Sequence, residues 1–209
     1  MFGDGALTLR EFARHEPLPL ATIHEAVLGF LRRREDAVLF GAQGVNAYVD
    51  EPRMTQDVDI LSTRAAELAE ELRRHRGEKF HIAVRVGSVA DGKEYQIFQL
   101  RRPESRHLAD VRQVSDFPPT QLVAEVRVPN PEELIAQKLM SYVARRGQPK
   151  SGTDWRDLTL LLLTYPNLNS ETGAVLDRLS ADGATEAAIE EWRRVVSLQI
   201  HGDEAETED

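Results

Sequence analysis

The spacing of apolar and polar residues changes near residue 129 of this chain. Before that point, short apolar runs alternate with amphipathic stretches that have the apolar spacing of a helix. The short runs predict strands at residues 37–40, 57–61, 80–88, 94–100, 107–114 and 122–128. The amphipathic stretches predict helices at residues 7–15, 20–34 and 63–76. Together they indicate an α+β fold (α/β mixed sheet) of about five strands with helices around it.

After residue 129 the pattern is helical only. Asn130, Pro131 and Glu132-Glu133 mark a helix start, because Asn caps, Pro suits the first turn and acids favour the positive end of the helix dipole. Further helices are predicted at residues 154–164, 170–179 and 185–199. We therefore expect a catalytic core at 1–129 and a helical part at 130–200. The acidic tail at 201–209 lacks large apolar residues and is expected to be disordered.

The segment from Val38 to Leu61 carries the strongest chemical signal. A short apolar strand ends at Gly41, a helix follows to Tyr48, and the next strand holds Asp57 and Asp59. Side chains alternate along a strand, so the two acids point to the same face. Mg²⁺ is bound by one or two carboxylates together with substrate phosphates, and a helix start suits a phosphate. The segment therefore predicts a phosphate cradle facing a metal site, although Gly41 alone is also compatible with a simple tight turn.

Composition narrows the class of protein. The chain has 209 residues, 41% hydrophobic residues, a formal net charge of −9 and no cysteine. The absence of cysteine excludes disulfides and thiolate metal sites, and the six histidines have no spacing typical of zinc ligands. The acidic balance argues against broad nucleic-acid binding. Since there is no apolar run of about 18 residues and no secretory signal, we expect a cytoplasmic protein without a membrane anchor.

The motif Gly41-x-x-Gly44 at a helix start, followed by Arg53-x-Thr55-x-Asp57-x-Asp59, resembles the DNA-polymerase-β-like nucleotidyltransferase superfamily. Within it, the sequence is most similar to the AbiEii-type and MenT-like group associated with bacterial toxin–antitoxin systems. The resemblance spans roughly residues 38–161. It implies an enzyme that transfers a nucleotidyl group from an NTP with Mg²⁺ (or Mn²⁺). The sequence departs where the superfamily often has Gly-Gly or Gly-Ser, because Ala42 keeps the backbone N–H groups but lacks a hydroxyl.

For the metal site, the resemblance implies three carboxylates. Asp57 and Asp59 are the first two, and Asp110 on the strand 107–114 is the candidate for the third. Simple alternation along that strand places Leu108 on the same face as Asp110. The alternative for Asp110 is an ordinary acid at a strand edge.

For the nucleotide, the resemblance implies that Lys138 binds phosphate and that Asp154 or Asp157 orients Lys138 or acts as an acid or base. The alternatives are an exposed lysine for Lys138 and a helix N-cap for Asp154. Gly41, Ala42, Gln43 and Gly44 would form the phosphate cradle.

Arg53 and Thr55 precede the acid pair. Thr55 would bind the triphosphate or cap local backbone. Arg53 would clamp phosphate or form a salt bridge with Asp57 or Asp50.

The expected activity is therefore transfer of an NMP group to an acceptor that the sequence does not identify. Candidates are tRNA, a protein hydroxyl or a small molecule, with a cognate antitoxin as a further partner. Two alternatives stay open at this point. One is a catalytically silent protein that binds NTP, and the other is an antitoxin-like interaction protein with the same fold.

Overall fold

The computed structural model describes residues 18–200 of the chain. The helix predicted at 7–15 and the acidic tail predicted at 201–209 lie outside these residues. Two compact units share the chain. Of the described residues, the sheet unit contains residues 18–43 and Met54–Val128, and the helical unit contains Gly44–Arg53 and residues 129–200.

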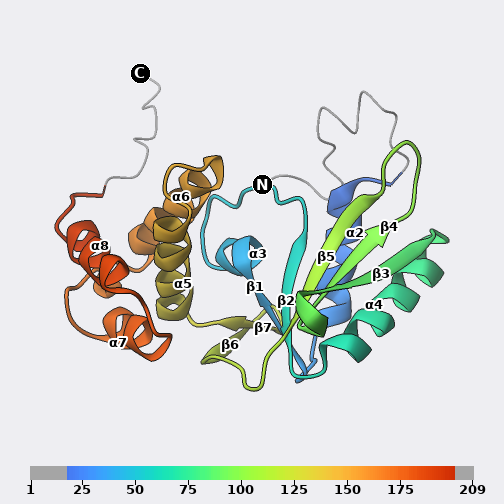
Figure 1. Cartoon of the computed structure of the whole chain (residues 1–209), viewed down its shortest axis with the longest axis horizontal. Coiled ribbons are helices and arrows are strands. Elements are labelled where there is room, and N and C mark those ends of the chain that lie inside the picture. The colour runs from blue at the N-terminus through green and yellow to red at the C-terminus, as the bar shows by residue number, and fades with distance from the viewer. Residues whose placement is uncertain (1–17, 201–209) are drawn as a thin grey trace. The chain divides into compact units, whose positions relative to one another are not determined.

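The sheet unit is built on a five-stranded mixed sheet (Figure 1). Its strands are β1 (Ala37–Phe40), β2 (Val58–Ser62), β3 (Val84–Val89), β4 (Glu94–Gln99) and β5 (Arg106–Gln113). The spatial order is β1-β2-β5-β4-β3, in which only β2 and β5 run parallel. A 3₁₀ turn, η1 (Ala90–Gly92), joins β3 to β4. The mixed α+β fold predicted from the sequence is confirmed.

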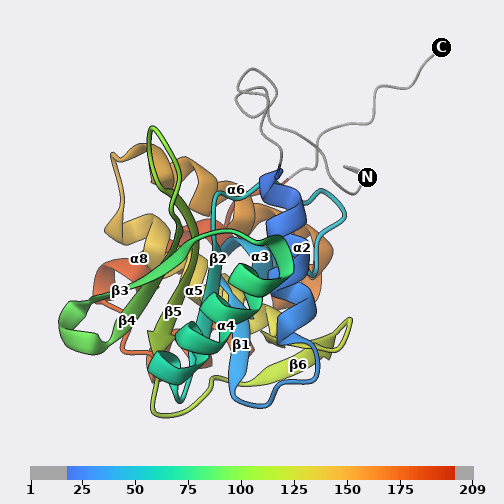
Figure 2. The same cartoon turned by 90° about the vertical axis from the view of Figure 1, so that its right-hand side faces the viewer.

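Two helices, α2 (Leu20–Leu31) and α4 (Ala65–Phe80), cover one face of this sheet (Figure 2). Apolar residues at alternate strand positions point to them and are fully buried, among them Val58, Ile60, Ala109, Val111 and Ile97. The intervening residues must then point to the opposite face. Strand β5 pairs with β2 on one side and with β4 on the other, which places Asp59, Asp110 and Gln96 side by side there.

Several predicted boundaries in the sheet unit are wrong. The strand predicted at 80–88 begins only at Val84, and the helix predicted at 20–34 ends at Leu31. The helix predicted at 63–76 continues to Phe80, because Arg76 is buried and donates a hydrogen bond to the carbonyl of Ile23 at 2.9 Å. The single strand predicted at 122–128 is a hairpin of β6 (Thr120–Val123) and β7 (Val126–Pro129). Its two turn residues, Ala124 and Glu125, have φ values of 47° and 68°, which residues other than glycine and asparagine rarely adopt.

The helical unit contains α5 (Pro131–Ala144), α6 (Pro149–Thr164), α7 (Ala174–Ala181) and α8 (Glu186–Val196), with a 3₁₀ turn η2 (Pro166–Leu168) after α6. Helix α5 packs against the other three helices, and Trp192 of α8 is completely buried. Helix α3 (Gly41–Asn46) ends in this unit, where the Tyr48 hydroxyl donates to the Pro129 carbonyl at 2.8 Å. Among the helices of residues 18–200, none is both long and apolar enough to cross a bilayer.

An ion-pair network stabilises the sheet unit and makes its stability depend on pH. Arg34 donates two hydrogen bonds to Asp36 at 2.8 Å, and Arg64 donates another at 2.7 Å. These guanidinium groups lower the pKa of Asp36 to about 2, with Arg34 as the main cause. A folded-state pKa below the unfolded value of about 3.9 stabilises the fold above that pH, and the contribution is lost as the pH falls toward 2.

We therefore expect Asp36→Asn to lower the free energy of unfolding at pH 6 by about 1–2 kcal/mol and by much less near pH 2.5. Urea unfolding at the two pH values measures this difference. Glu70→Gln is the control, because Glu70 forms an exposed ion pair with Arg73 and its removal should change stability by under about 0.5 kcal/mol. An equal loss for Asp36→Asn at both pH values would contradict the assignment.

Candidate functional site

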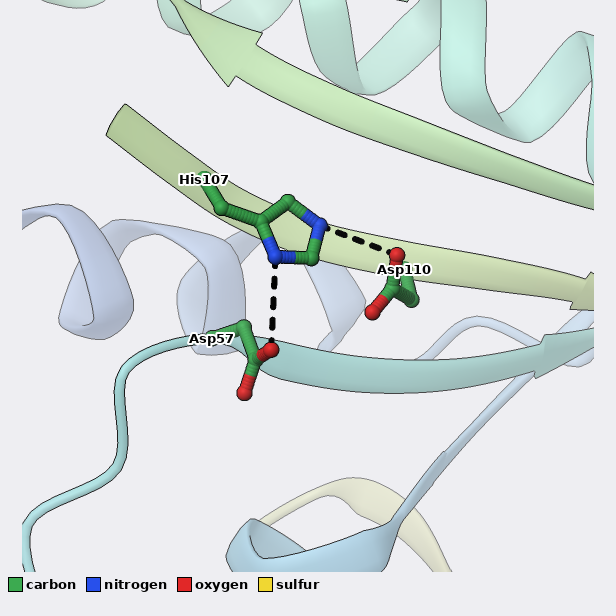
Figure 3. Close-up of side chains that lie close together, drawn as sticks. All are labelled: Asp57, His107 and Asp110. Atoms are coloured by element: carbon green, nitrogen blue, oxygen red, sulfur yellow. Dashed lines mark hydrogen bonds and ion pairs between the residues drawn. The ribbon is translucent and has the colours of Figure 1, made fainter. Parts of the chain in front are cut away.

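Three side chains of the sheet unit, Asp57, His107 and Asp110, form a cluster suited to a metal ion (Figure 3). Asp57 directly precedes β2, and the other two residues lie on β5. One potential ligand atom from each lies within 4.8 Å of the others. His107 Nδ1 is 3.3 Å from Asp57 Oδ2, and His107 Nε2 is 2.9 Å from Asp110 Oδ1. We call these three residues the Asp-His-Asp cluster.

A β-bulge brings His107 into this cluster. Ile97 of β4 pairs with Ala109 and Phe98 pairs with His107, which leaves Leu108 as an extra residue in β5. The extra residue reverses the alternation beyond it. His107 and Asp110, three positions apart, therefore point to the same face, and Leu108 is buried with 1% exposure. The sequence-based placement of Leu108 beside Asp110 is wrong for this reason.

The two carboxylates hold a positive charge on the histidine. Hydrogen bonds to Asp110 and, second, to Asp57 outweigh burial and raise the pKa of His107 to about 10. The imidazole is therefore cationic at neutral pH and sits between two acids that would otherwise repel each other. Phe98 stacks on the ring with a centroid distance of 4.9 Å and fixes its plane.

Asp59 is the neighbour of Asp110 on the adjacent strand and lies against Gly41. A Cβ atom at position 41 would lie 2.1 Å from Asp59 Oδ2, so that only glycine fits. Gly41 also has a φ of 65°, in the left-handed region that favours glycine. Because Gly41 directly follows β1 and Phe40 pairs with Asp59, the turn into α3 lies next to the acid pair predicted from the sequence.

The donor set of this face fits a divalent cation. It comprises the carboxylates of Asp57 and Asp110 and one imidazole, so that oxygen donors are in the majority. Asp59, the other carboxylate predicted for this site, pairs with Asp110 from β2 but is not one of the three residues whose ligand atoms lie within 4.8 Å of one another. Mg²⁺ and Mn²⁺ prefer oxygen ligands of this type. The same two carboxylates raise the pKa of His107, so the cluster favours a positive charge between Asp57 and Asp110. His107 could not be predicted from histidine spacing, because its partners in the cluster are two acids and no second histidine.

The residues predicted for the phosphate cradle lie at the start of α3. Gly41, Ala42, Gln43 and Gly44 form its first turn. The side-chain amide of Gln43 donates to the Thr55 hydroxyl at 2.8 Å, and Thr55 is 5% exposed. Two side chains predicted to contact the nucleotide therefore contact each other.

A second group of charged side chains, which we call the lysine cluster, lies in the helical unit. It consists of Lys138 on α5, Asp154 and Asp157 on α6, Arg145 after α5, and Arg53. Lys138 Nζ is 2.8 Å from Asp157 Oδ2 and 3.6 Å from Asp154 Oδ1. Arg53 binds both carboxylate oxygens of Asp157, at 2.8 and 3.0 Å. Arg145 Nη1 is 2.8 Å from Asp154 Oδ2.

Lys138, Asp154 and Asp157 of the lysine cluster are buried, which decides two of the sequence-based alternatives. Lys138 is 8% exposed, so it is not a surface lysine on a polar stripe. Asp154 is 3% exposed and cannot be the helix N-cap, because α6 begins earlier, at Pro149, with Gln148 as its N-cap. The sequence prediction of a helix start at residue 154 is wrong, since a proline at the first helical position is favourable and starts the helix at 149.

Asp157→Asn tests whether these ion pairs hold the helical unit together. Burial alone would raise the pKa of Asp157, but Arg53 and Lys138 outweigh it and lower the pKa. Asparagine keeps the shape of the side chain and one acceptor oxygen. It removes the negative charge that balances the positive charges of Lys138 and Arg53. We expect a loss of about 2 kcal/mol in the free energy of unfolding, measured with urea. Asp177→Asn, in the first turn of α7, is the control with a change of under about 0.5 kcal/mol; equal effects would contradict the role of the ion pairs.

Comparison with known proteins gives one family match. The family model described as nucleotidyl transferase AbiEii toxin, Type IV TA system, matches residues 28–205. No curated protein matches the sequence.

Two solved structures share the fold at low sequence identity. The polyadenylate synthase of Megavirus has a TM-score of 0.59 and 13% identity, with 76% of this chain and 34% of that chain covered. The present chain therefore spans about a third of the length of the viral enzyme. JHP933 from Helicobacter pylori has a TM-score of 0.52 and 12% identity, with 91% and 89% covered. The family match extends over most of the sequence, and we conclude that this chain belongs to the AbiEii nucleotidyltransferase toxin family.

Proposed function

We propose that this protein transfers an NMP group from an NTP to an acceptor with the help of Mg²⁺ or Mn²⁺. The observation that carries the proposal is the cluster of Asp57, His107 and Asp110 on one face of the sheet. Asp59 pairs with Asp110 on the adjacent strand and lies against Gly41, where an added side chain would clash. When bound, the divalent cation supplies positive charge that polarises the phosphate under attack and neutralises the triphosphate.

The chain's own residues divide the work in this proposal. Asp57 and Asp110 bind the cation, and Asp59 completes the carboxylate set from the neighbouring strand. The N–H groups at the start of α3, from Gly41 to Gly44, bind phosphate oxygens. The contact between Gln43 and Thr55 keeps the segment between α3 and β2 in position.

Lys138 is proposed to bind a phosphate of the NTP and to neutralise charge on the leaving pyrophosphate. Asp157 and Asp154 position its ammonium group, and Asp157 takes no proton in this scheme because its pKa is lowered. We expect Lys138→Met to weaken NTP binding about tenfold, as measured by calorimetry with a non-hydrolysable analogue. Lys150→Met, at an exposed lysine, should bind as the wild type does. Equal affinity of Lys138→Met and wild type would contradict the role.

The acceptor and the biological partner belong to the same proposal. The toxin family supports an NTP substrate and a cognate antitoxin. A tRNA, a protein hydroxyl and a small molecule remain the acceptor classes to be tested. We place tRNA first in the experiment because one labelled pool covers many sequences at once.

The test is incubation of the full chain with each α-³²P-labelled NTP, Mg²⁺ or Mn²⁺ and total tRNA, followed by separation of RNA from protein. Label on RNA or on the protein supports the proposal and identifies the acceptor class. A second reaction with a pool of small hydroxyl compounds covers the third class. If calorimetry shows binding of NTP with Mg²⁺ but no acceptor takes up label, the protein is a nucleotide-binding module without transfer activity, and the proposal fails.

A further inference from the structure

His107 has no role in a site made of carboxylates alone, yet both of its ring nitrogens contact acids of that site. We propose that His107 is a direct ligand of the divalent cation and makes the site prefer Mn²⁺ over Mg²⁺. This inference rests on the metal site of the proposed function and adds the residue that selects the ion.

The two ring nitrogens of His107 face different acids, and each nitrogen has a different role in this proposal. Nε2 is 2.9 Å from Asp110 Oδ1, an ordinary hydrogen bond. Histidine ligands commonly donate their second ring N–H to a carboxylate, which fixes the ring orientation. Nδ1 is 3.3 Å from Asp57 Oδ2. A bound cation would replace the Nδ1 proton, which would be released to solvent, and Nδ1 and Asp57 would then hold the ion together.

The surroundings hold the ring in this position. Phe98 stacks on His107 with an angle of 30° between the rings, and the guanidinium of Arg85 lies 5.5 Å from the centre of the Phe98 ring (Figure 3 shows the histidine between the two acids). The bulge at Leu108 interrupts the regular strand pairing and re-aims His107 toward Asp57 and Asp110. A side chain fixed by stacking, by a hydrogen bond and by the bulge loses little conformational freedom when it binds an ion.

An imidazole ligand would make the site prefer Mn²⁺ over Mg²⁺ because the two ions differ in the ligand atoms they accept. Mg²⁺ requires near-ideal octahedral oxygen coordination and keeps several waters. First-row transition-metal ions bind imidazole nitrogen together with carboxylate oxygen. Mg²⁺ instead prefers oxygen ligands only. A site with one imidazole and up to three carboxylates therefore binds Mn²⁺ more tightly than a site of carboxylates alone, while its affinity for Mg²⁺ changes little.

The experiment uses the full chain with a non-hydrolysable NTP analogue and measures Mn²⁺ binding by electron paramagnetic resonance, with Mg²⁺ as competitor. Electron spin-echo modulation from ¹⁴N reports a histidine bound to Mn²⁺. Wild type should show this modulation, and His107→Gln should lose it and weaken Mn²⁺ binding about tenfold or more. His107→Gln should change Mg²⁺ binding by less than about threefold, because oxygen ligands carry that ion.

His75→Gln is the matched control. His75 also stacks on a phenylalanine, Phe30, at 5.2 Å, but it lies on α4 outside the cluster. It should keep both the modulation and the Mn²⁺ affinity. Circular dichroism checks that each variant is folded, and His107→Asn provides a second variant with a smaller side chain.

Each outcome has a separate meaning. Bound Mn²⁺ without nitrogen modulation, or an unchanged ratio of Mn²⁺ to Mg²⁺ affinity in His107→Gln and His107→Asn, overturns the role of His107 and leaves the proposed function standing. Unchanged Mn²⁺ binding in Asp57→Asn and Asp110→Asn places the ion elsewhere and overturns the proposed metal site itself.

Discussion

Asp57→Asn is expected to reduce nucleotidyl transfer by about a thousandfold and to leave the fold intact. The carboxylate of Asp57 would hold the cation that stabilises negative charge on the reacting phosphate. A loss of about 4 kcal/mol in transition-state stabilisation corresponds to a rate about a thousandfold lower. The side chain of Asp57 is 33% exposed and lies before β2 outside the core. Its replacement should therefore lower the melting temperature by only a few degrees. Single-turnover rates with labelled NTP and a melting curve measure the two effects.

The matched control for this prediction is Asp116→Asn. Asp116 is an exposed acid of the same unit, after β5, and should transfer nucleotide at the wild-type rate. If Asp57→Asn keeps activity within fivefold of wild type, Asp57 does not hold the catalytic ion. If activity falls only because the variant melts below the assay temperature, the loss is structural, and assays at 10 °C separate the two cases.

Strands and helices were predicted correctly where a local pattern, such as alternation or a helix-capping sequence, was sufficient to define them. The alternation in residues 57–61 placed both acids on one strand face, and Asn130-Pro131 marked the start of α5. Several predictions that failed depended on non-local contacts, whereas the start of α6 was missed although Pro149 is a local signal. Helix α4 extends beyond the predicted end because Arg76 bonds to the Ile23 carbonyl of another helix. No local pattern in the sequence contains that partner.

In the candidate site, too, local sequence patterns identified some residues, and the others depended on contacts between distant parts of the chain. Asp57 and Asp110 were found because acids interrupt apolar strands, and Lys138 was found because it interrupts an apolar helix. His107 was not found, because its direction depends on a bulge in β5 that pairing with β4 creates. The partners of Lys138 lie on the neighbouring helix α6, which the sequence predicted to start at Asp154 instead of Pro149. Residues from different strands or helices can be assigned to one cluster only when the packing of those strands or helices is known.

Gly41→Ala should impair both stability and catalysis, because it strains the backbone at residue 41 and pushes the added Cβ atom against Asp59. An alanine in the left-handed region costs about 1–2 kcal/mol, and overpacking adds about 1–3 kcal/mol. The Cβ atom would lie 2.1 Å from Asp59 Oδ2, 2.8 Å from Asp59 Cγ and 3.0 Å from Asp59 Cβ. Rotation of the carboxylate relieves the first contact, but the Cβ of Asp59 is fixed by strand pairing to Phe40 and Asp110.

We expect Gly41→Ala to lower the free energy of unfolding by about 2–4 kcal/mol and to reduce nucleotidyl transfer at least about a hundredfold, because the displaced carboxylate belongs to the proposed metal site. Gly29→Ala is the control, since no atom lies within 4 Å of the added Cβ in α2, and it should stabilise the protein by up to about 1 kcal/mol. The double variant Gly41→Ala with Asp59→Gly removes the clash but keeps the strained φ. It should recover about half of the lost stability and none of the activity. A Gly41→Ala variant with wild-type stability and transfer would show that β1, α3 and β2 do not enclose the acid in the way the structure requires.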